Sequence, residues 1–164
     1  MKAAVAIRPM TAGDIPSAMA LADTLPEAPH WNRSVYETAL HPAIQPGRMV
    51  LLAEAPDGSL AGFAVASWTG PEAELESIAV APAWQRRRVA HALFSHLAAH
   101  LRDRGAQSVL LEVRVSNRPA RNLYHSLGFA ETGRRRGYYA DPREDAIILR
   151  LELVSGPPDA VSEA

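Results

Sequence analysis

The chain has 164 residues, with 17 Lys and Arg against 18 Asp and Glu, a formal net charge of −1, and no cysteine. This length suits a single domain, and the balanced charge argues against a general nucleic-acid or anionic-membrane binder. The absence of cysteine excludes disulfides, thiolate metal ligands and a cysteine nucleophile. No stretch reaches the roughly 18 apolar residues of a membrane span, and the first ten residues lack the apolar core of a signal peptide, so we expect a cytoplasmic protein.

The first half of the chain is predicted to contain four strands and two helices. Thr11, followed by Asp14 three residues later, resembles a capping box at the start of a helix. Asp57 and Gly58 lie in a turn signal between two apolar runs, which indicates a hairpin. We expect strands at residues 3–8, 49–55, 60–68 and 73–80, and helices at residues 11–20 and 34–40, the latter within a proline-interrupted stretch.

The second half is predicted to follow the order helix, strand, helix, strand, strand. Apolar residues recur at helical spacing from Val89 to Leu101, and Asn117 is a good N-cap for a shorter helix. We expect helices at residues 85–104 and 117–127, and strands at residues 108–115, 129–137 and 146–153. Residues 1–154 then form one domain, and residues 155–164 are polar and rich in Pro and Gly, which predicts a flexible tail.

Residues 78–90 end a strand, turn, and open the most regular helix of the chain. A helix N-terminus presents unpaired N–H groups and a partial positive charge, which together attract anions. Arg86, Arg87 and Arg88 in this turn oppose the helix dipole, so an anionic ligand is a specific reason to keep them. The alternative is a solvated basic first turn. Neither the Walker nor the Rossmann glycine pattern is present.

Four motifs occur in order over residues 75–153. They are Ile78-Ala79-Val80 with Gln85-Arg86-Arg87-Arg88-Val89-Ala90, Leu111-Glu112-Val113-Arg114-Val115-Ser116-Asn117, Ala120 to Phe129, and Arg136-Gly137-Tyr138-Tyr139 with Arg143-Glu144-Asp145-Ala146. Together they resemble the GNAT N-acetyltransferases, and within them the RimI branch that acetylates protein N termini. One departure is that Arg88 stands where the pattern has its first glycine. A residue with a Cβ fits there if its φ is negative, which is what we expect.

The resemblance implies an α/β (or α+β) fold: a mixed, mostly antiparallel sheet of about seven strands with helices on both faces. Two parallel strands, residues 73–80 and 108–115, would splay apart around acetyl-CoA. The implied cofactor-binding residues are Ile78, Ala79, Val80, Gln85, Arg86, Arg87, Arg88, Val89, Ala90, His91 and Asn117.

Two catalytic residues follow from the same resemblance, Glu112 as general base and Tyr124 as general acid. A carboxylate in an apolar strand is costly without a partner, so the alternative for Glu112 is an ion pair with an arginine, for which Arg114 on the same strand face is the candidate. Tyr124 would otherwise be a core residue with its hydroxyl at the edge. Asn117 could be an N-cap alone.

The implied acceptor is a protein N terminus, with the alanine end of a small-subunit ribosomal protein as the leading candidate. Trp31, Tyr138 and Tyr139 would bind it, although the tyrosines could be simple cross-strand aromatics. Neutralising an α-amino group at pH 7 costs about 1 kcal/mol, against nearly 5 for lysine, which suits a modest base.

Two other functions stay open: a GNAT acting on a small-molecule amine or a lysine, and a non-catalytic acyl-CoA-binding module. We expect no metal, because His91, His96 and His100 lie on one helix without a further convergent ligand. We also expect no direct contact with nucleic acid, since no aromatic residue interleaves the run from Arg134 to Arg136.

Overall fold

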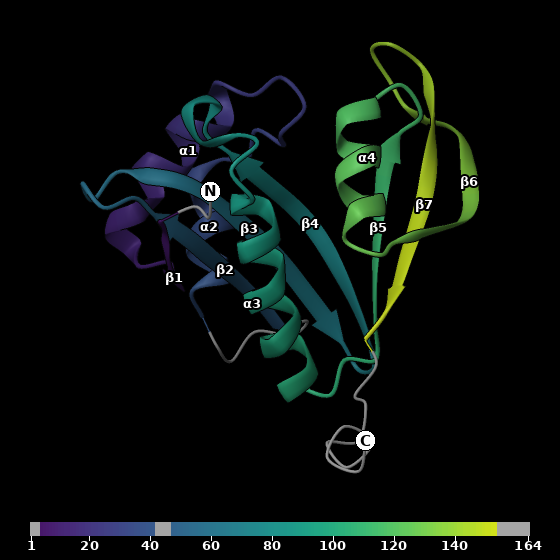
Figure 1. Cartoon of the computed structure of the whole chain (residues 1–164). Helices are drawn as coiled ribbons and strands as arrows, with labels where there is room; N and C mark the ends of the chain where they lie inside the picture. Colours follow the sequence, from purple (N-terminus) through teal and green to yellow (C-terminus); the bar gives the residue numbers. More distant parts are fainter. Residues whose placement is uncertain (1–3, 42–46, 154–164) are drawn as a thin grey trace.

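The computed structural model describes residues 4–41 and 47–153, so the predicted tail lies outside the described residues. These residues form one seven-stranded sheet in the order β1-β2-β3-β4-β5-β7-β6 (Figure 1). The strands are β1 Ala6–Pro9, β2 Gly47–Glu54, β3 Leu60–Thr69, β4 Glu72–Val80, β5 Ser108–Arg114, β6 Ala130–Tyr139 and β7 Glu144–Glu152. Every neighbouring pair is antiparallel except β4 and β5, which confirms the predicted mixed sheet.

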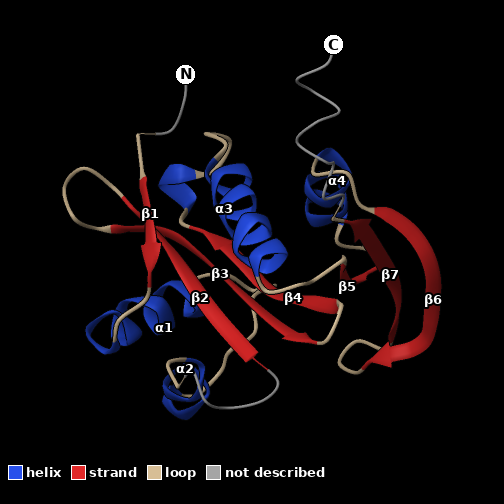
Figure 2. Cartoon of the chain, turned by 90° about the horizontal axis from the view of Figure 1, so that it is seen from below, coloured by secondary structure: helices blue, strands red, loops and turns tan. Residues whose placement is uncertain are grey.

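Helices cover both faces of the sheet, as predicted. The helices are α1 Ile15–Asp23, α2 Arg33–Ala39, α3 Val89–Asp103 and α4 Arg118–Ser126. Figure 2 shows α1 and α2 on one face of the N-terminal half, and α3 and α4 on the opposite face. No helix in the described part of the chain is long and apolar enough to span a membrane.

Two apolar cores follow from the period-two alternation of the strands. Adjacent residues of β2 point to opposite faces of the sheet: Leu52 packs in the core under α1 and α2, whereas Leu51 packs in the core under α3. Leu93 and Leu97 of α3 are fully buried in the second core, at the spacing of one helical turn. Both sheet faces in the N-terminal half are therefore covered by helices.

Strands β4 and β5 pair over only three positions, Glu72 with Ser108, Ala73 with Val109 and Glu74 with Leu110. Beyond these positions the two strands diverge toward their carboxyl ends (Figure 1). The predicted splay of two neighbouring parallel strands is thus confirmed, and the loops that follow β4 and β5 lie on either side of it.

The predicted helix caps are present, but the predicted start of α3 was wrong. The Asp14 carboxylate accepts from the Thr11 backbone N–H at 2.8 Å, and Asn117 Oδ1 accepts from the Ala120 N–H at 3.2 Å. Helix α3 begins at Val89 rather than at residue 85, because residues 82–84 form a 3-10 turn and the next four residues form an open turn.

Candidate active site

The turn before α3 takes a backbone conformation that glycine favours, without having a glycine. Arg86 has a φ of 63° and Arg88 a φ of 64°, both in the left-handed region. Our expectation of a negative φ at Arg88 was therefore wrong. The turn keeps the geometry that the family pattern serves with glycine, and an L-residue with a Cβ holds it at a cost of about 1–2 kcal/mol.

Six successive backbone N–H groups at this turn are free to bind a ligand. Arg88, the N-cap, makes no side-chain capping bond, and no acceptor in the described part of the chain pairs with the N–H groups from Arg86 to His91. Gln85 fixes the turn to the end of β4, because its side-chain amide donates to the Val80 carbonyl at 3.1 Å. A row of unpaired N–H groups at a helix N-terminus fits the pyrophosphate of coenzyme A.

The side chains around the turn are partly committed to other contacts. The Arg87 guanidinium lies 5.1 Å from the centre of the Trp84 ring. His91, in the first turn of α3, lies with Nε2 3.1 Å from Ser126 Oγ, which links α3 to α4. Burial and then the charge of Arg88 lower the pKa of His91, which favours the neutral ring. Ile78 and Val80 pack against the core under α3, whereas Ala79 packs against the core under α1 and α2.

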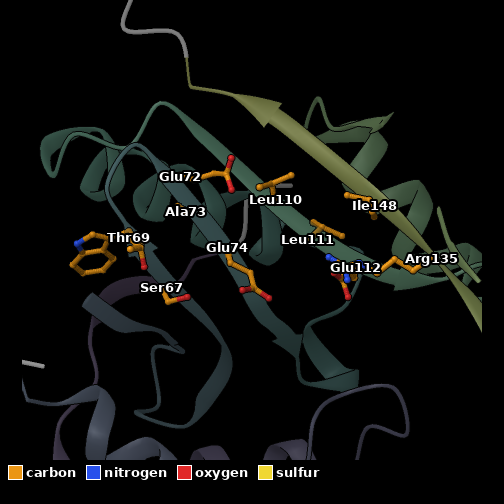
Figure 3. A pocket seen from close by; sticks show the side chains of 11 residues that line it. Ser67, Thr69, Glu72, Ala73, Glu74, Leu110, Leu111, Glu112, Arg135 and Ile148 are labelled. Atoms are coloured by element: carbon orange, nitrogen blue, oxygen red, sulfur yellow. Dashed lines mark ion pairs between the residues drawn. The ribbon is translucent and has the colours of Figure 1, made fainter. Parts of the chain in front are cut away.

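Glu112 lies on the face of β5 that points away from α3. Val109, Leu111 and Val113 of the same strand are buried in the core under α3, so the alternation directs Glu112 to the opposite face, where its side chain is 23% exposed. It borders a pocket of about 320 Å³ (Figure 3). The other residues around this pocket are Ser67, Trp68, Thr69, Glu72, Ala73, Glu74, Leu110, Leu111, Arg135 and Ile148.

The partner of Glu112 is Arg135 of β6, with Nε 3.0 Å from Oε1, and not Arg114. Arg114 is directed to the β6–β7 turn instead: it lies 3.3 Å from a Glu144 oxygen and donates to the carbonyls of Ala140 and Pro142 at 3.1 and 3.0 Å. The prediction that Arg114 could pair with Glu112 was wrong, because the turn after β6 folds back over β5 and supplies these nearer acceptors.

Tyr138 and Tyr139 stand beside Glu112, at the end of β6. Their rings meet edge to face at 5.0 Å, and Tyr138 is 51% exposed. The pKa of Tyr138 is raised, first by hydrogen bonding to Glu112 and then by burial. Arg114 lies 4.3 Å from the centre of the Tyr139 ring. The two tyrosines therefore lie near the carboxylate, and their contact with an acceptor stays a prediction.

Tyr124 approaches from the other face of the sheet, on α4. It packs edge to face against Phe129 at 5.9 Å, and burial, followed by the charge of Tyr139, raises its pKa to about 12. Its hydroxyl therefore stays protonated near neutral pH and can donate a proton. Tyr124 thus packs on the α3 side of the sheet, whereas Glu112 lies on the opposite face.

Trp31 lies on the same side of the sheet as Glu112. In the described part of the chain, no aromatic contact joins it to Tyr138 or Tyr139. Its ring meets Tyr36 at 5.8 Å, and the Arg48 guanidinium lies 6.0 Å from its centre. Arg48 in turn forms an ion pair with Glu76 of β4. The structure brings Trp31 toward β4 through this pair and leaves its contact with an acceptor a prediction.

Sequence reasoning missed Arg135 and Glu74. Glu74 of β4 faces Glu112 across the splay, and its pKa is raised by burial and then by the charges of Glu76 and Glu112. No group of three His, Asp or Glu side chains suited to a metal occurs within residues 4–41 and 47–153.

A splayed sheet with a free row of N–H groups at the turn after β4 suits an enzyme that transfers an acyl group from coenzyme A. The comparisons agree: residues 18–129 match the model of the acetyltransferase (GNAT) family. The chain belongs to the GNAT family and is an acetyl-CoA-dependent N-acetyltransferase.

Relatives and solved structures support this. The ribosomal protein bS18-alanine N-acetyltransferase of Escherichia coli (strain K12) is 46% identical over 99 residues, 59% of this chain and 67% of that protein. A Bacillus subtilis (strain 168) relative is 32% identical over 153 residues, 93% of this chain and 99% of that protein. The crystal structure of the Escherichia coli enzyme superposes with a TM-score of 0.79 and 34% identity, covering 94% of this chain and 97% of that one. The crystal structure of Ard1 from Thermoplasma volcanium also superposes with a TM-score of 0.79, at 26% identity, covering 92% of this chain and 99% of that one.

Proposed function

We propose that this enzyme acetylates the α-amino group of a protein N terminus, with the alanine end of a small-subunit ribosomal protein as the first candidate. The observation that carries the proposal is the Glu112 carboxylate, which is ion-paired with Arg135 at the border of a pocket. The name of the Escherichia coli relative, which acts on ribosomal protein bS18, supports this choice of acceptor.

In this proposal the chain binds acetyl-CoA through the turn before α3. The N–H groups from Arg86 to His91 hold the pyrophosphate, with the arginine charges around them, and Asn117 and the end of β4 line the pantetheine arm. When bound, acetyl-CoA supplies a thioester carbonyl that a neutral amine can attack. Every other part of the mechanism falls to the side chains around the splay.

Glu112 acts as general base and Tyr124 as general acid. Glu112 takes a proton from the acceptor ammonium, directly or through a water, which leaves the amine neutral. Tyr124 stays protonated because its pKa is about 12, so it is suited to protonate the departing thiolate from the α4 side. The two groups lie on opposite faces of the sheet, so each has a separate role in proton transfer.

The choice of an α-amino acceptor rests on proton affinity and on shape. An α-amino group titrates near 8 and a lysine near 10.4, so a carboxylate base is better matched to the first. Tyr138 and Tyr139 stand at the border of the site, where they can hold the backbone of a slim peptide end. A small first residue such as alanine fits this arrangement.

A panel of acceptors tests the proposal. The enzyme is incubated with acetyl-CoA and a peptide with a free N-terminal alanine, the same peptide with a blocked N terminus and an added lysine, or a polyamine, and CoA release is followed. We expect turnover with the free N terminus only. Turnover confined to lysine or polyamine would show a GNAT enzyme of different acceptor class.

A further inference from the structure

Arg135 reaches the proposed base from an unexpected strand. In the sheet β7 lies between β5 and β6, and Ile148 of β7 is the register partner of Glu112. The Arg135 side chain, on β6, crosses β7 to place Nε 3.0 Å from Glu112 Oε1 (Figure 3). Its guanidinium also lies 5.7 Å from the centre of the Tyr138 ring. One side chain therefore touches both the base and the adjacent aromatic wall.

The charges around Glu112 make Arg135 the cation that balances it. Glu74 faces it from β4, Arg135, Tyr138 and Tyr139 face it from β6, and β7 contributes the apolar Ile148. The nearest other cations are engaged elsewhere in the described part of the chain. Arg114 of β5 binds Glu144 and the turn carbonyls, and Arg48 of β2 binds Glu76.

We propose that Arg135 is a positioning residue for the acetyl transfer: its guanidinium balances the charge of Glu112 beside Glu74 and holds Oε1, so that Oε2 is the oxygen presented to the acceptor proton. This inference rests on the proposed role of Glu112 as general base. The proton leaves the acceptor nitrogen and ends on Glu112, and Arg135 keeps its own protons throughout, since a guanidinium does not titrate in the working range.

The neighbouring arginine supplies a matched control. Arg134 is exposed to a similar degree, 51% against 57%, and forms its ion pair with Glu131, Nε to Oε1 at 3.0 Å, rather than with Glu112. Both arginines are more than half exposed, and ion pairs at the surface add little stability. Losing either one should therefore leave the Tm nearly unchanged, and only the loss of Arg135 should alter catalysis.

The expected effect is a shift of the acidic limb of the kcat/KM profile. In Arg135→Gln, Glu112 faces Glu74 with no cation beside them. The limb should move up by about one pH unit, and kcat near pH 7 should fall by about tenfold, with the affinity for CoA unchanged. Arg135→Lys keeps the charge without the planar guanidinium. Its acidic limb should therefore lie close to the wild-type position, whereas its kcat should recover only in part.

The experiment compares pH profiles of the wild type, Arg135→Gln, Arg135→Lys, Arg134→Gln and Glu112→Gln, with thermal unfolding as the check on folding. The expected pattern is a shifted limb in Arg135→Gln, recovery in Arg135→Lys, and wild-type behaviour in Arg134→Gln. An inactive Glu112→Gln beside a wild-type profile in Arg135→Gln overturns this inference alone, as does an equal loss in Arg134→Gln. A fully active Glu112→Gln overturns the general-base assignment and this inference with it.

Discussion

Replacing Arg88 by glycine should make the protein more stable. Arg88 holds a φ of 64°, which costs an L-residue about 1–2 kcal/mol, and glycine removes that cost. Glycine also gains about 0.5–1 kcal/mol of freedom in the unfolded chain, which offsets part of the benefit. The net expectation is a gain of about 0.5–1 kcal/mol, or about 1–4 °C in Tm for a chain of this size.

The matched control is the residue next to it. Arg87 does not have a positive φ, and its guanidinium stacks on Trp84. Arg87→Gly should therefore lower the Tm, through backbone entropy and the lost stacking.

Thermal unfolding of both variants tests the sign, and calorimetry with CoA tests the site. Since the backbone N–H groups persist in Arg88→Gly, CoA affinity should stay within about tenfold, a change of about 1.4 kcal/mol. A lower Tm in Arg88→Gly than in the wild type would refute the strain argument. A thousandfold loss of affinity would mean that the Arg88 side chain is a principal ligand.

The remaining predictions concern the cofactor, the catalytic pair and the N-terminal cap. Calorimetry should show that pantetheine binds more weakly than CoA, and equal affinities would disprove the phosphate cradle. Glu112→Gln and Tyr124→Phe should each lower kcat by about a hundredfold to ten-thousandfold with CoA affinity nearly intact, whereas full activity in a folded variant would remove that residue from the mechanism. Because the pKa of Tyr124 is about 12, the wild type should show no loss of its acid function below about pH 10, and an earlier alkaline limb that vanishes in Tyr124→Phe would contradict this. Arg8, the largest cause, holds the pKa of Asp14 well below its usual range, so the stability that Asp14 adds is complete above the ordinary carboxyl range and is lost as the pH falls. The Tm difference between the wild type and Asp14→Asn should thus be constant above about pH 5 and shrink below about pH 4; a difference that grows in acid would reverse the sign.

The sequence was sufficient for those features that depend on local chemistry. Asn117 caps α4 because its side chain bonds three residues ahead, a pattern that is visible in one dimension. The splay between β4 and β5 was implied by the resemblance to the GNAT family, and the short pairing of the two strands confirms it.

Features that depend on distant chain segments escaped prediction. Arg135 pairs with Glu112, but the sequence of β6 does not predict this pair. Register shifts between Glu131 and Gly133 and between Arg135 and Tyr139 break the period-two alternation of the strand. The positive φ of Arg88 was not predicted for another reason. The turn imposes this left-handed conformation, and an arginine in a sequence does not indicate it.

Mass spectrometry of a single peptide tests the central claim most directly. The peptide carries a free N-terminal alanine and an internal lysine, so both amines meet the enzyme and acetyl-CoA at the same concentration. We expect acetyl on the α-amino group, with no more than a trace on the lysine. Acetylation confined to the lysine would leave the GNAT fold standing and contradict the proposed N-terminal acceptor.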